Sequence, residues 1–155
     1  SETEKYTESS NFSAGKNAKV VSTTIGIFGL SICYDVRFPH LYRGLSKRGA
    51  QLLTVPAAFT VPTGDAHWEI LLRARAIENG AFVIAPAQAG THRFSDGGSR
   101  KTYGHSMVVD PWGTVLVNAK GNTNGISYFS CDISKVEIAR SQLPSLTHDC
   151  NYSYE

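Results

Sequence analysis

The chain of 155 residues is predicted to fold as an α/β protein. Two observations carry this prediction. Apolar runs with the length of buried strands alternate along the sequence with segments of helical periodicity. Glycine and proline stand at most of the junctions between these segments, where they end one element before the next begins. With 41% hydrophobic residues, a chain of this length can bury a core of its own.

The first predicted strand covers residues 25–32, an apolar run with small residues interleaved. This pattern is typical of a strand that is buried on both faces. A turn at Cys33 follows, and a helix is expected over about 39–48. Gly49 ends that helix as a C-cap because glycine adopts the left-handed conformation at little cost.

The next strand is expected at residues 52–55, followed by a break from Pro62 to Asp65. Asp65 is the expected N-cap of a long helix, since a short acidic side chain can accept hydrogen bonds from the first free N–H groups. The helix runs to residue 79 and ends at Gly80.

The second half of the chain is expected to consist mainly of strands. A buried strand covers residues 81–87, and an exposed loop covers 93–100. Residues 104–109 and 114–118 flank the turn sequence Asp-Pro-Trp-Gly and form a hairpin. A further strand is expected at residues 126–132.

A short final helix is expected to begin at Ser134, because Ser134 and Glu137 have the spacing of a capping box. It ends before Pro144. Only the first few residues and the tail after Pro144 have the character of flexible ends.

A single cysteine stands where the first apolar run meets a tight turn and a helix start. Asp35 offers an N-cap and Pro39 a first-turn proline just after Cys33. Thiols near the positive end of a helix dipole are often nucleophilic. Free cysteines are also among the most buried residues, so a core role for Cys33 stays open on these residues alone.

Three segments resemble the nitrilase superfamily of carbon–nitrogen hydrolases. They are Ile-Cys-Tyr-Asp-Val-Arg-Phe-Pro at residues 32–39, Ala-His-Trp-Glu-Ile-Leu-Leu-Arg-Ala-Arg-Ala-Ile-Glu-Asn at 66–79, and Tyr-Gly-His-Ser-Met-Val-Val-Asp-Pro-Trp-Gly at 103–113. The third has the form found in deaminated glutathione amidase and ω-amidase-like members. The likeness covers about residues 6–143, and residues 144–155 form a tail.

The resemblance implies an α-β-β-α sandwich of the nitrilase type, of which residues 1–155 are about the C-terminal half of one domain. It also implies hydrolysis of a small linear amide to a carboxylate and ammonia, as in a deaminated glutathione amidase. Because the chain begins without Met inside a family-like segment, its true N-terminus and any targeting signal are expected to be missing.

Amide cleavage needs a strong nucleophile, stabilisation of a tetrahedral oxyanion, and a proton for the departing ammonia. Cys33 is the expected nucleophile and forms a thioester acyl-enzyme. The backbone N–H of Tyr34, next to the nucleophile, is the expected oxyanion donor. The scheme needs no cofactor and no metal, and the sequence has no cluster of metal ligands.

The family performs this chemistry with a Glu, a Lys and the Cys, helped by a second Glu. Glu8, which lies 25 residues before Cys33, matches the second Glu and would orient the lysine and the substrate amide. Taken alone, Glu8 fits a solvated surface carboxylate better. The flanking Tyr-Thr-Glu-Ser sequence and Gly15, which resemble the family, favour the catalytic assignment. The base Glu and the Lys precede this position in the family and have no counterpart here, so the chain alone is expected to be inactive.

Substrate preference is expected to come from loops at the pocket rim. Phe59 is a candidate apolar wall, and Gln88, Arg93 or Arg100 are candidates to bind carboxylates or polar groups of the acyl chain. The alternative for the arginines is that they are solvated loop residues.

Other polar residues are expected to serve the structure. A Cys-His pair using His67 or His105 is an alternative mechanism, but both positions favour structural hydrogen bonding. Asp35 and Arg37 are expected to pair and shape the turn. Salt bridges on the long helix are expected from Glu69, Arg73 and Arg75, and Cys131 and Cys150 are expected to be inert.

Composition excludes several classes. A net charge of +2 with dispersed Lys and Arg does not indicate nucleic-acid binding. Three cysteines without paired spacing indicate neither a disulfide framework nor a zinc site, and they favour the cytoplasm. No apolar run of membrane-spanning length occurs. The expected partners are a small amide substrate and, at full length, further copies of the protein. The rival hypothesis is a non-catalytic fragment or an associating subunit.

Overall fold

A six-stranded sheet organises the chain, in a computed structural model that describes residues 13–95, 97–120 and 125–154. The strand order is β1-β2-β3-β4-β7-β8. The strands are β1 Lys19–Thr23, β2 Gly26–Leu30, β3 Leu52–Thr54, β4 Phe82–Ala85, β7 Ser106–Val109 and β8 Val115–Ala119. β2, β3 and β4 run parallel, and the outer strands are antiparallel to their neighbours. The α/β prediction is confirmed.

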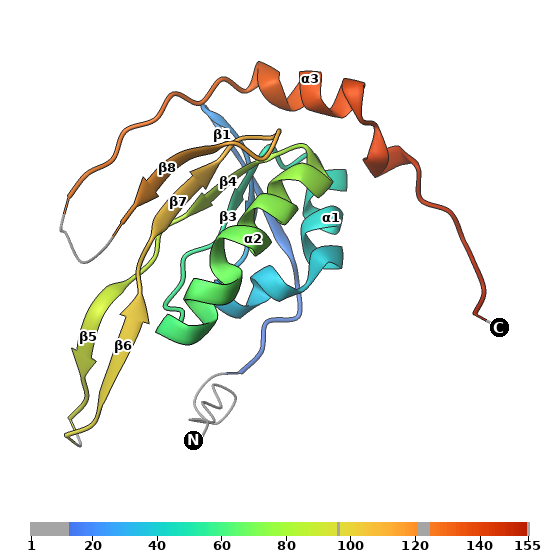
Figure 1. The fold of residues 1–155 in the computed structure, drawn as a ribbon. Coiled ribbons are helices and arrows are strands. Elements are labelled where there is room, and N and C mark those ends of the chain that lie inside the picture. The colour runs from blue at the N-terminus through green and yellow to red at the C-terminus, as the bar shows by residue number, and fades with distance from the viewer. Residues whose placement is uncertain (1–12, 96, 121–124, 155) are drawn as a thin grey trace.

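Two helices connect the parallel strands, as parallel pairing requires a crossover. They are α1 Pro39–Lys47, between β2 and β3, and α2 Val61–Asn79, between β3 and β4. Both cover the same face of the sheet (Figure 1). A short 3-10 helix, η2 Cys33–Arg37, lies between β2 and α1. Near the C-terminus of the described chain lie two further helices, α3 Ser134–Gln142 and η3 Ser145–Thr147.

The core lies between the sheet and the two crossover helices. Leu53 of β3 and Val83 of β4 are fully buried against Leu72 and Trp68 of α2. Strand residues alternate between the two faces, so Leu52 and Phe82 point the other way and pack on Val136 of α3. Fully burying a large apolar side chain contributes about 1.5–3 kcal/mol, so these layers stabilise the body that carries the site.

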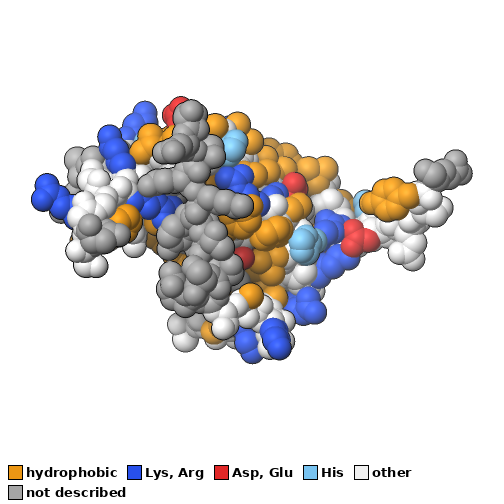
Figure 2. Space-filling model, turned by 90° about the horizontal axis from the view of Figure 1, so that it is seen from below, with side chains coloured by type: hydrophobic (Ala, Val, Ile, Leu, Met, Phe, Trp, Pro, Cys, Tyr) orange, Lys and Arg blue, Asp and Glu red, His pale blue; other side chains and the backbone are white. Residues whose placement is uncertain are grey.

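The prediction that residues 25–32 are buried on both faces is wrong for the described chain. Ile25, Leu30 and Ile32 expose 68%, 44% and 64% of their surface. The reason is that α1 and α2 cover one face, whereas α3 covers only part of the other. Hydrophobic side chains also gather over a broad area of the side of the molecule shown in Figure 2.

The long helix begins earlier than predicted. It starts at Val61 instead of Asp65, and Pro62 lies in its first turn. Proline is tolerated there because first-turn N–H groups have no acceptor within the helix. Its end is as predicted, with Gly80 in the left-handed conformation at φ +51°.

Three predictions near the C-terminal half need correction. The loop at 93–100 is the end of a hairpin formed by β5 Ala89–Arg93 and β6 Ser99–Tyr103, which projects from the body (Figure 1). Residues 126–132 form no strand, because no neighbouring strand pairs with the described part of this run. Ser134 is the first residue of α3 and Ile133 its N-cap, so the predicted capping box of Ser134 and Glu137 does not form. Asp132 Oδ1, just before the cap, accepts the Ser134 N–H at 3.0 Å.

Candidate active site

Cys33 lies at a sharp turn where β2 ends and η2 begins. Its φ is +46°, a left-handed conformation that side chains other than glycine rarely adopt. Such a conformation costs on the order of 1–3 kcal/mol and persists only where the surroundings hold it. A strained strand-to-helix turn that presents a nucleophile is the arrangement of a nucleophile elbow.

Hydrogen bonds fix the turn on both sides of Cys33. The Cys33 N–H donates to Pro56 O at 2.8 Å. The Ile32 N–H donates to Asp35 Oδ2, and the Asp35 N–H donates to Ile32 O, both at 2.9 Å. Asp35 lies inside this short helix and bonds the backbone N–H of its N-cap, Ile32. The prediction of Asp35 as the N-cap of the following helix is wrong, because Phe38 occupies that position in α1.

The predicted pairing of Asp35 with Arg37 is wrong, because the Asp35 carboxylate is taken by the backbone of the turn. The Arg37 guanidinium instead lies 5.5 Å from the ring centroids of Tyr34 and Phe59. It also forms a hydrogen bond of 3.3 Å with His67 Nδ1. Arg37 thus braces the outside of the turn through aromatic contacts.

The backbone N–H of Tyr34 follows directly on Cys33. Within the described residues it has no hydrogen-bond acceptor, whereas the N–H groups of Cys33 and Asp35 are both bonded. The second position of a helix start leaves an N–H free in this way. A free N–H beside the thiol is the geometry that an oxyanion donor needs.

A pocket of about 510 Å³ opens at Cys33. Its walls are the segments that follow the carboxyl ends of β2, β3 and β4, where ligands bind in open parallel sheets. Besides Cys33, it is lined by Gln88, Ser106 and small apolar residues. No carboxylate, lysine, arginine or histidine of the described chain lines it.

The structure brings one of the predicted substrate residues to this pocket. Gln88 lines it, and its backbone is fixed by bonds to Ala57 O and from the Gly104 N–H, at 2.9 and 3.0 Å. Phe59 is 7% exposed and packs on Trp68 with 4.8 Å between the ring centroids. It does not line the pocket.

The arginines and Glu8 lie elsewhere. Arg93 ends β5 in the projecting hairpin, opposite Ser99, and does not line the pocket. Arg100 Nη2 donates to Ala58 O at 2.8 Å and so supports the pocket wall. Glu8 lies outside the described residues.

The histidines serve the structure. His105 Nδ1 bonds Asn118 Oδ1 at 3.0 Å, and its carbonyl accepts the Trp68 Nε1–H at 2.8 Å. His67 bonds Arg37. Neither histidine lines the Cys33 pocket.

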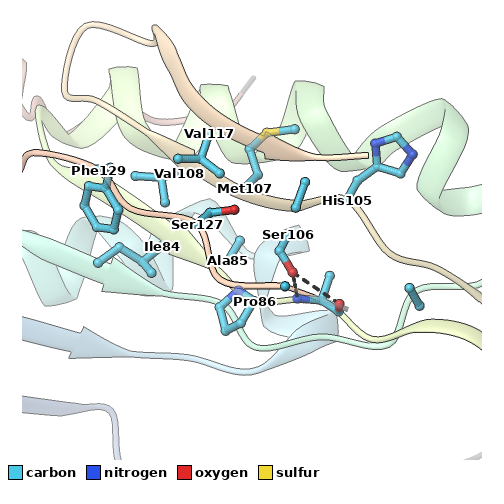
Figure 3. A pocket seen from close by; sticks show the side chains of 14 residues that line it. Ile84, Ala85, Pro86, His105, Ser106, Met107, Val108, Val117, Ser127 and Phe129 are labelled. Atoms are coloured by element: carbon cyan, nitrogen blue, oxygen red, sulfur yellow. Dashed lines mark hydrogen bonds between the residues drawn. The ribbon is translucent and has the colours of Figure 1, made fainter. Parts of the chain in front are cut away.

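Ser106 is a pocket residue that sequence reasoning missed. Its hydroxyl accepts the Ala87 N–H at 2.8 Å and donates to Ala87 O at 3.3 Å (Figure 3). The side chain therefore holds the backbone just beyond the last β4–β7 pair, Ala85 with Met107. Ser106 also lines a neighbouring pocket of about 280 Å³, beside Met107 and Val108. Only its place in the third family-like segment could have indicated it.

Within the described residues there is neither a metal-ligand cluster nor a membrane-spanning helix. No group of three or more His, Cys, Asp or Glu side chains there could hold a metal ion. No helix in the described ranges is both long enough and apolar enough to span a bilayer.

The carbon–nitrogen hydrolase family matches residues 2–141. The chain belongs to this family. A protein of Synechocystis named deaminated glutathione amidase is 50% identical over 145 residues, which cover 92% of this chain and 52% of that protein. The chain spans about half the length of the curated amidases that it matches.

Solved structures of family members agree with the fold. The Caenorhabditis elegans NitFhit protein superposes with a TM-score of 0.79 at 49% identity, over 88% of this chain and 32% of that chain. The amidase of Nesterenkonia sp. AN1 has a TM-score of 0.63 at 36% identity, over 73% of this chain and 42% of that chain. That structure is of a Glu-to-Gln mutant of the amidase and shows the result of Michael addition of acrylamide at the active-site cysteine. The fold class predicted from the sequence is confirmed.

Proposed function

We propose that the full-length protein hydrolyses a small linear amide through a thioester on Cys33. The observation that carries this proposal is the strained turn that presents Cys33 in a pocket, next to the free N–H of Tyr34. The cysteine adduct of the Nesterenkonia amidase, a family member, supports the same role for Cys33.

The reaction has two stages. The Cys33 Sγ forms a bond with the carbonyl carbon, and the oxyanion accepts a hydrogen bond from the Tyr34 N–H. The C–N bond then breaks, and the nitrogen takes a proton and leaves as ammonia. Water attacks the thioester, which releases the carboxylic acid and restores the Cys33 thiol.

Proton transfer needs groups that the described pocket does not contain. Its lining has no titratable side chain besides Cys33. We therefore assign the base and the cation to the Glu and Lys that the family uses, and the orienting role to Glu8, which the family resemblance supports. An isolated Cys-His pair receives no support from the placement of His67 and His105.

The proposed substrate class is an ω-amide of the deaminated glutathione type. Relatives at 43–50% identity bear the name deaminated glutathione amidase. Gln88 and Ser106 are the polar residues besides Cys33 that line the pocket, and the Ser106 hydroxyl is bonded to Ala87, so we assign the polar contact with the acyl chain to Gln88. The apolar lining residues would accommodate the methylene groups of the chain. Phe59 and Arg93 are left out of the proposed contacts because they lie away from the pocket. A non-catalytic role gains no support from relatives named as amidases.

Kinetics of variants in the full-length protein test the function. Cys33→Ser is expected to lower kcat by about 10⁴-fold or more, because the nucleophile is lost. Cys131→Ser is the matched control, since Cys131 is an exposed cysteine that does not line the Cys33 pocket. Turnover that survives in Cys33→Ser, or that is lost in Cys131→Ser, would contradict the proposal.

We also propose that the full-length protein assembles with copies of itself. Ile70 and Ile77 lie two turns apart on α2 and expose 70% and 49% of their surface. Trp112 and Ile138 are also exposed, at 58% and 53%. Sedimentation of the full-length protein is expected to show an oligomer that Ile70→Asp weakens. A wild-type monomer at micromolar concentration would contradict this.

A further inference from the structure

Two buried polar side chains lie beside the Cys33 turn, and the proposed chemistry uses neither. Arg75 of α2 is 4% exposed, and Tyr42 of α1 is fully buried. The Arg75 guanidinium carbon lies 5.6 Å from the centroid of the Tyr42 ring. The sequence predicts Arg75 as a salt-bridge residue on the long helix, and it does pair with Glu78 at 2.9 Å. The side chain is nevertheless buried, and its Nε–H faces the Cys33 turn.

Arg75 holds the chain after Cys33. Its Nε–H donates to Val36 O at 2.9 Å, inside the protein. Val36 belongs to η2 and is itself fully buried. A charged donor bonded to a carbonyl in a dry environment is stronger than the same bond at the surface. Arg75 therefore fixes the 3-10 helix that Cys33 begins.

Tyr42 holds the chain before Cys33. Its hydroxyl lies 2.5 Å from Ser31 Oγ, and Ser31 Oγ donates to Thr54 O at 2.7 Å. Because Ser31 has a single hydroxyl proton, Tyr42 is the donor to Ser31. Burial raises the pKa of Tyr42 to about 12, so the phenol keeps the proton that this bond requires.

We propose that Arg75 and Tyr42 are positioning residues that hold the Cys33 turn in its left-handed conformation. Ser31 and Val36 flank the strained residue, and each is tied to one member of this stacked pair. A conformation with positive φ at a side-chain-bearing residue relaxes unless its neighbours are fixed. The pair acts through the backbone and does not contact the pocket.

The inference rests on the proposed function for its catalytic consequence. Variants of the full-length protein test it, with hydrogen exchange of residues 31–37 and kinetics measured together. Arg75→Met removes the charged donor and keeps an apolar stem. Arg73→Met is the matched control, because Arg73 on the same helix donates to Gly113 O at the same distance of 2.9 Å, far along the chain from the turn.

Arg75→Met is expected to lower kcat by about 10-fold or more, with KM within about twofold, since misplacing a reacting group affects the chemical step. Exchange of residues 31–37 becomes faster, while exchange in β3 and β4 is unchanged. Arg75→Lys recovers part of kcat because an ammonium can still donate to Val36 O. Tyr42→Phe is expected to lower kcat and to speed exchange of residues 31–37 by smaller amounts. It tests the positioning role if Arg75→Met does not fold.

Equal kinetics and equal exchange in the Arg75 and Arg73 variants would overturn the inference. So would an effect of Arg75→Met and Tyr42→Phe on global stability alone, with kcat unchanged. If wild type itself shows no amidase activity, the proposed function fails. Faster exchange of residues 31–37 in the Arg75 and Tyr42 variants, and not in Arg73→Met, would still support the positioning role.

Discussion

At the scale of single residues, backbone strain is concentrated beside the pocket. Within the described ranges, Cys33 and His105 are the two residues other than glycine with positive φ. Cys33 lines the pocket, and His105 precedes Ser106, whose hydroxyl lines it too. Strain of this kind collects at sites where geometry matters more than stability. The two strained residues therefore point to the same part of the molecule as the pocket does.

The order in which the three cysteines are alkylated tests whether thiol reactivity or solvent exposure decides their modification. Cys131 and Cys150 are exposed, whereas Cys33 is half-buried. Burial and the nearby charge of Asp132 raise the pKa of Cys131, which lowers its thiolate fraction. The reaction uses limiting iodoacetamide at pH 7.5, which is about one unit below the pKa of an ordinary thiol. Under these conditions we expect Cys33 to be modified first. Peptide mapping by mass spectrometry measures the order, and faster modification of Cys131 or Cys150 would contradict the assignment.

At the scale of elements, the sequence predicts some helix ends well because they depend on residues close by in the chain. α1 begins at Pro39, and α2 ends before Gly80, because capping and first-turn chemistry act within a few residues. The strand predicted at 126–132 failed because a strand exists only where a partner pairs with it. β1 was missed for the converse reason, since its pairing with β2 outweighs its polar sequence.

The residues of the candidate site also fall into two groups, those that the sequence can locate and those that depend on distant contacts. Cys33, Tyr34 and Gln88 follow strand ends, so the strand prediction together with the family-like segments could locate them. The roles of Ser106 and Arg75 depend on contacts with residues 19 and 39 positions away. A pattern within one segment cannot contain that information. The same limit explains why the sequence predicts the salt bridge of Arg75 on the long helix but not its hydrogen bond to Val36 O.

Two helical glycines give opposite predictions for the same substitution. A Cβ at Gly64 of α2 would lie 2.2 Å from the Tyr103 ring, whereas at Gly44 of α1 the nearest atom is the flexible end of Arg48 at 3.5 Å. Gly64→Ala should destabilise the fold by about 1–3 kcal/mol through overpacking. Gly44→Ala should stabilise it by up to about 1 kcal/mol. Urea unfolding measures both, and equal effects would contradict the packing of α2 on β6.

At the scale of the whole molecule, the C-terminal segment is fastened to α1 and α2 by polar contacts of Ser145 and Asp149 before it runs outward (Figures 1 and 2). Asp149 accepts hydrogen bonds from Arg43 and Lys47 of α1. Arg43 also donates to Ser145 O at 2.5 Å. Beyond Asp149, Tyr152 and Tyr154 expose 77% and 90% of their surface. The Asp149 carboxylate therefore supplies one part of the attachment, beside the hydrogen bonds of Ser145 with Arg43 and with Glu78 O.

Acid is expected to release this segment. The hydrogen bonds from Arg43 and Lys47 lower the pKa of Asp149 to about 2. A carboxyl group with a depressed pKa contributes its stabilisation above its usual pKa and loses it as the pH falls through the lowered value. Limited proteolysis at residues 145–149 should therefore be slower at pH 6 than at pH 2, with an acid-active protease at both. Asp149→Asn is the control and should be cleaved quickly at both pH values; slow cleavage of this variant at pH 6 would contradict the attachment.

The central claim is that Cys33 carries the acyl group during amide hydrolysis. The most direct measurement is mass spectrometry of the full-length protein, acid-quenched at a series of times after mixing with excess butyramide, an amide seen in complex with the Nesterenkonia amidase. We predict a butyryl mass on the peptide that contains Cys33, which appears before ammonia is released in full and disappears as butyrate forms. Ammonia release with the acyl mass on Cys131 or Cys150, or on no cysteine at any quench time, would contradict the account.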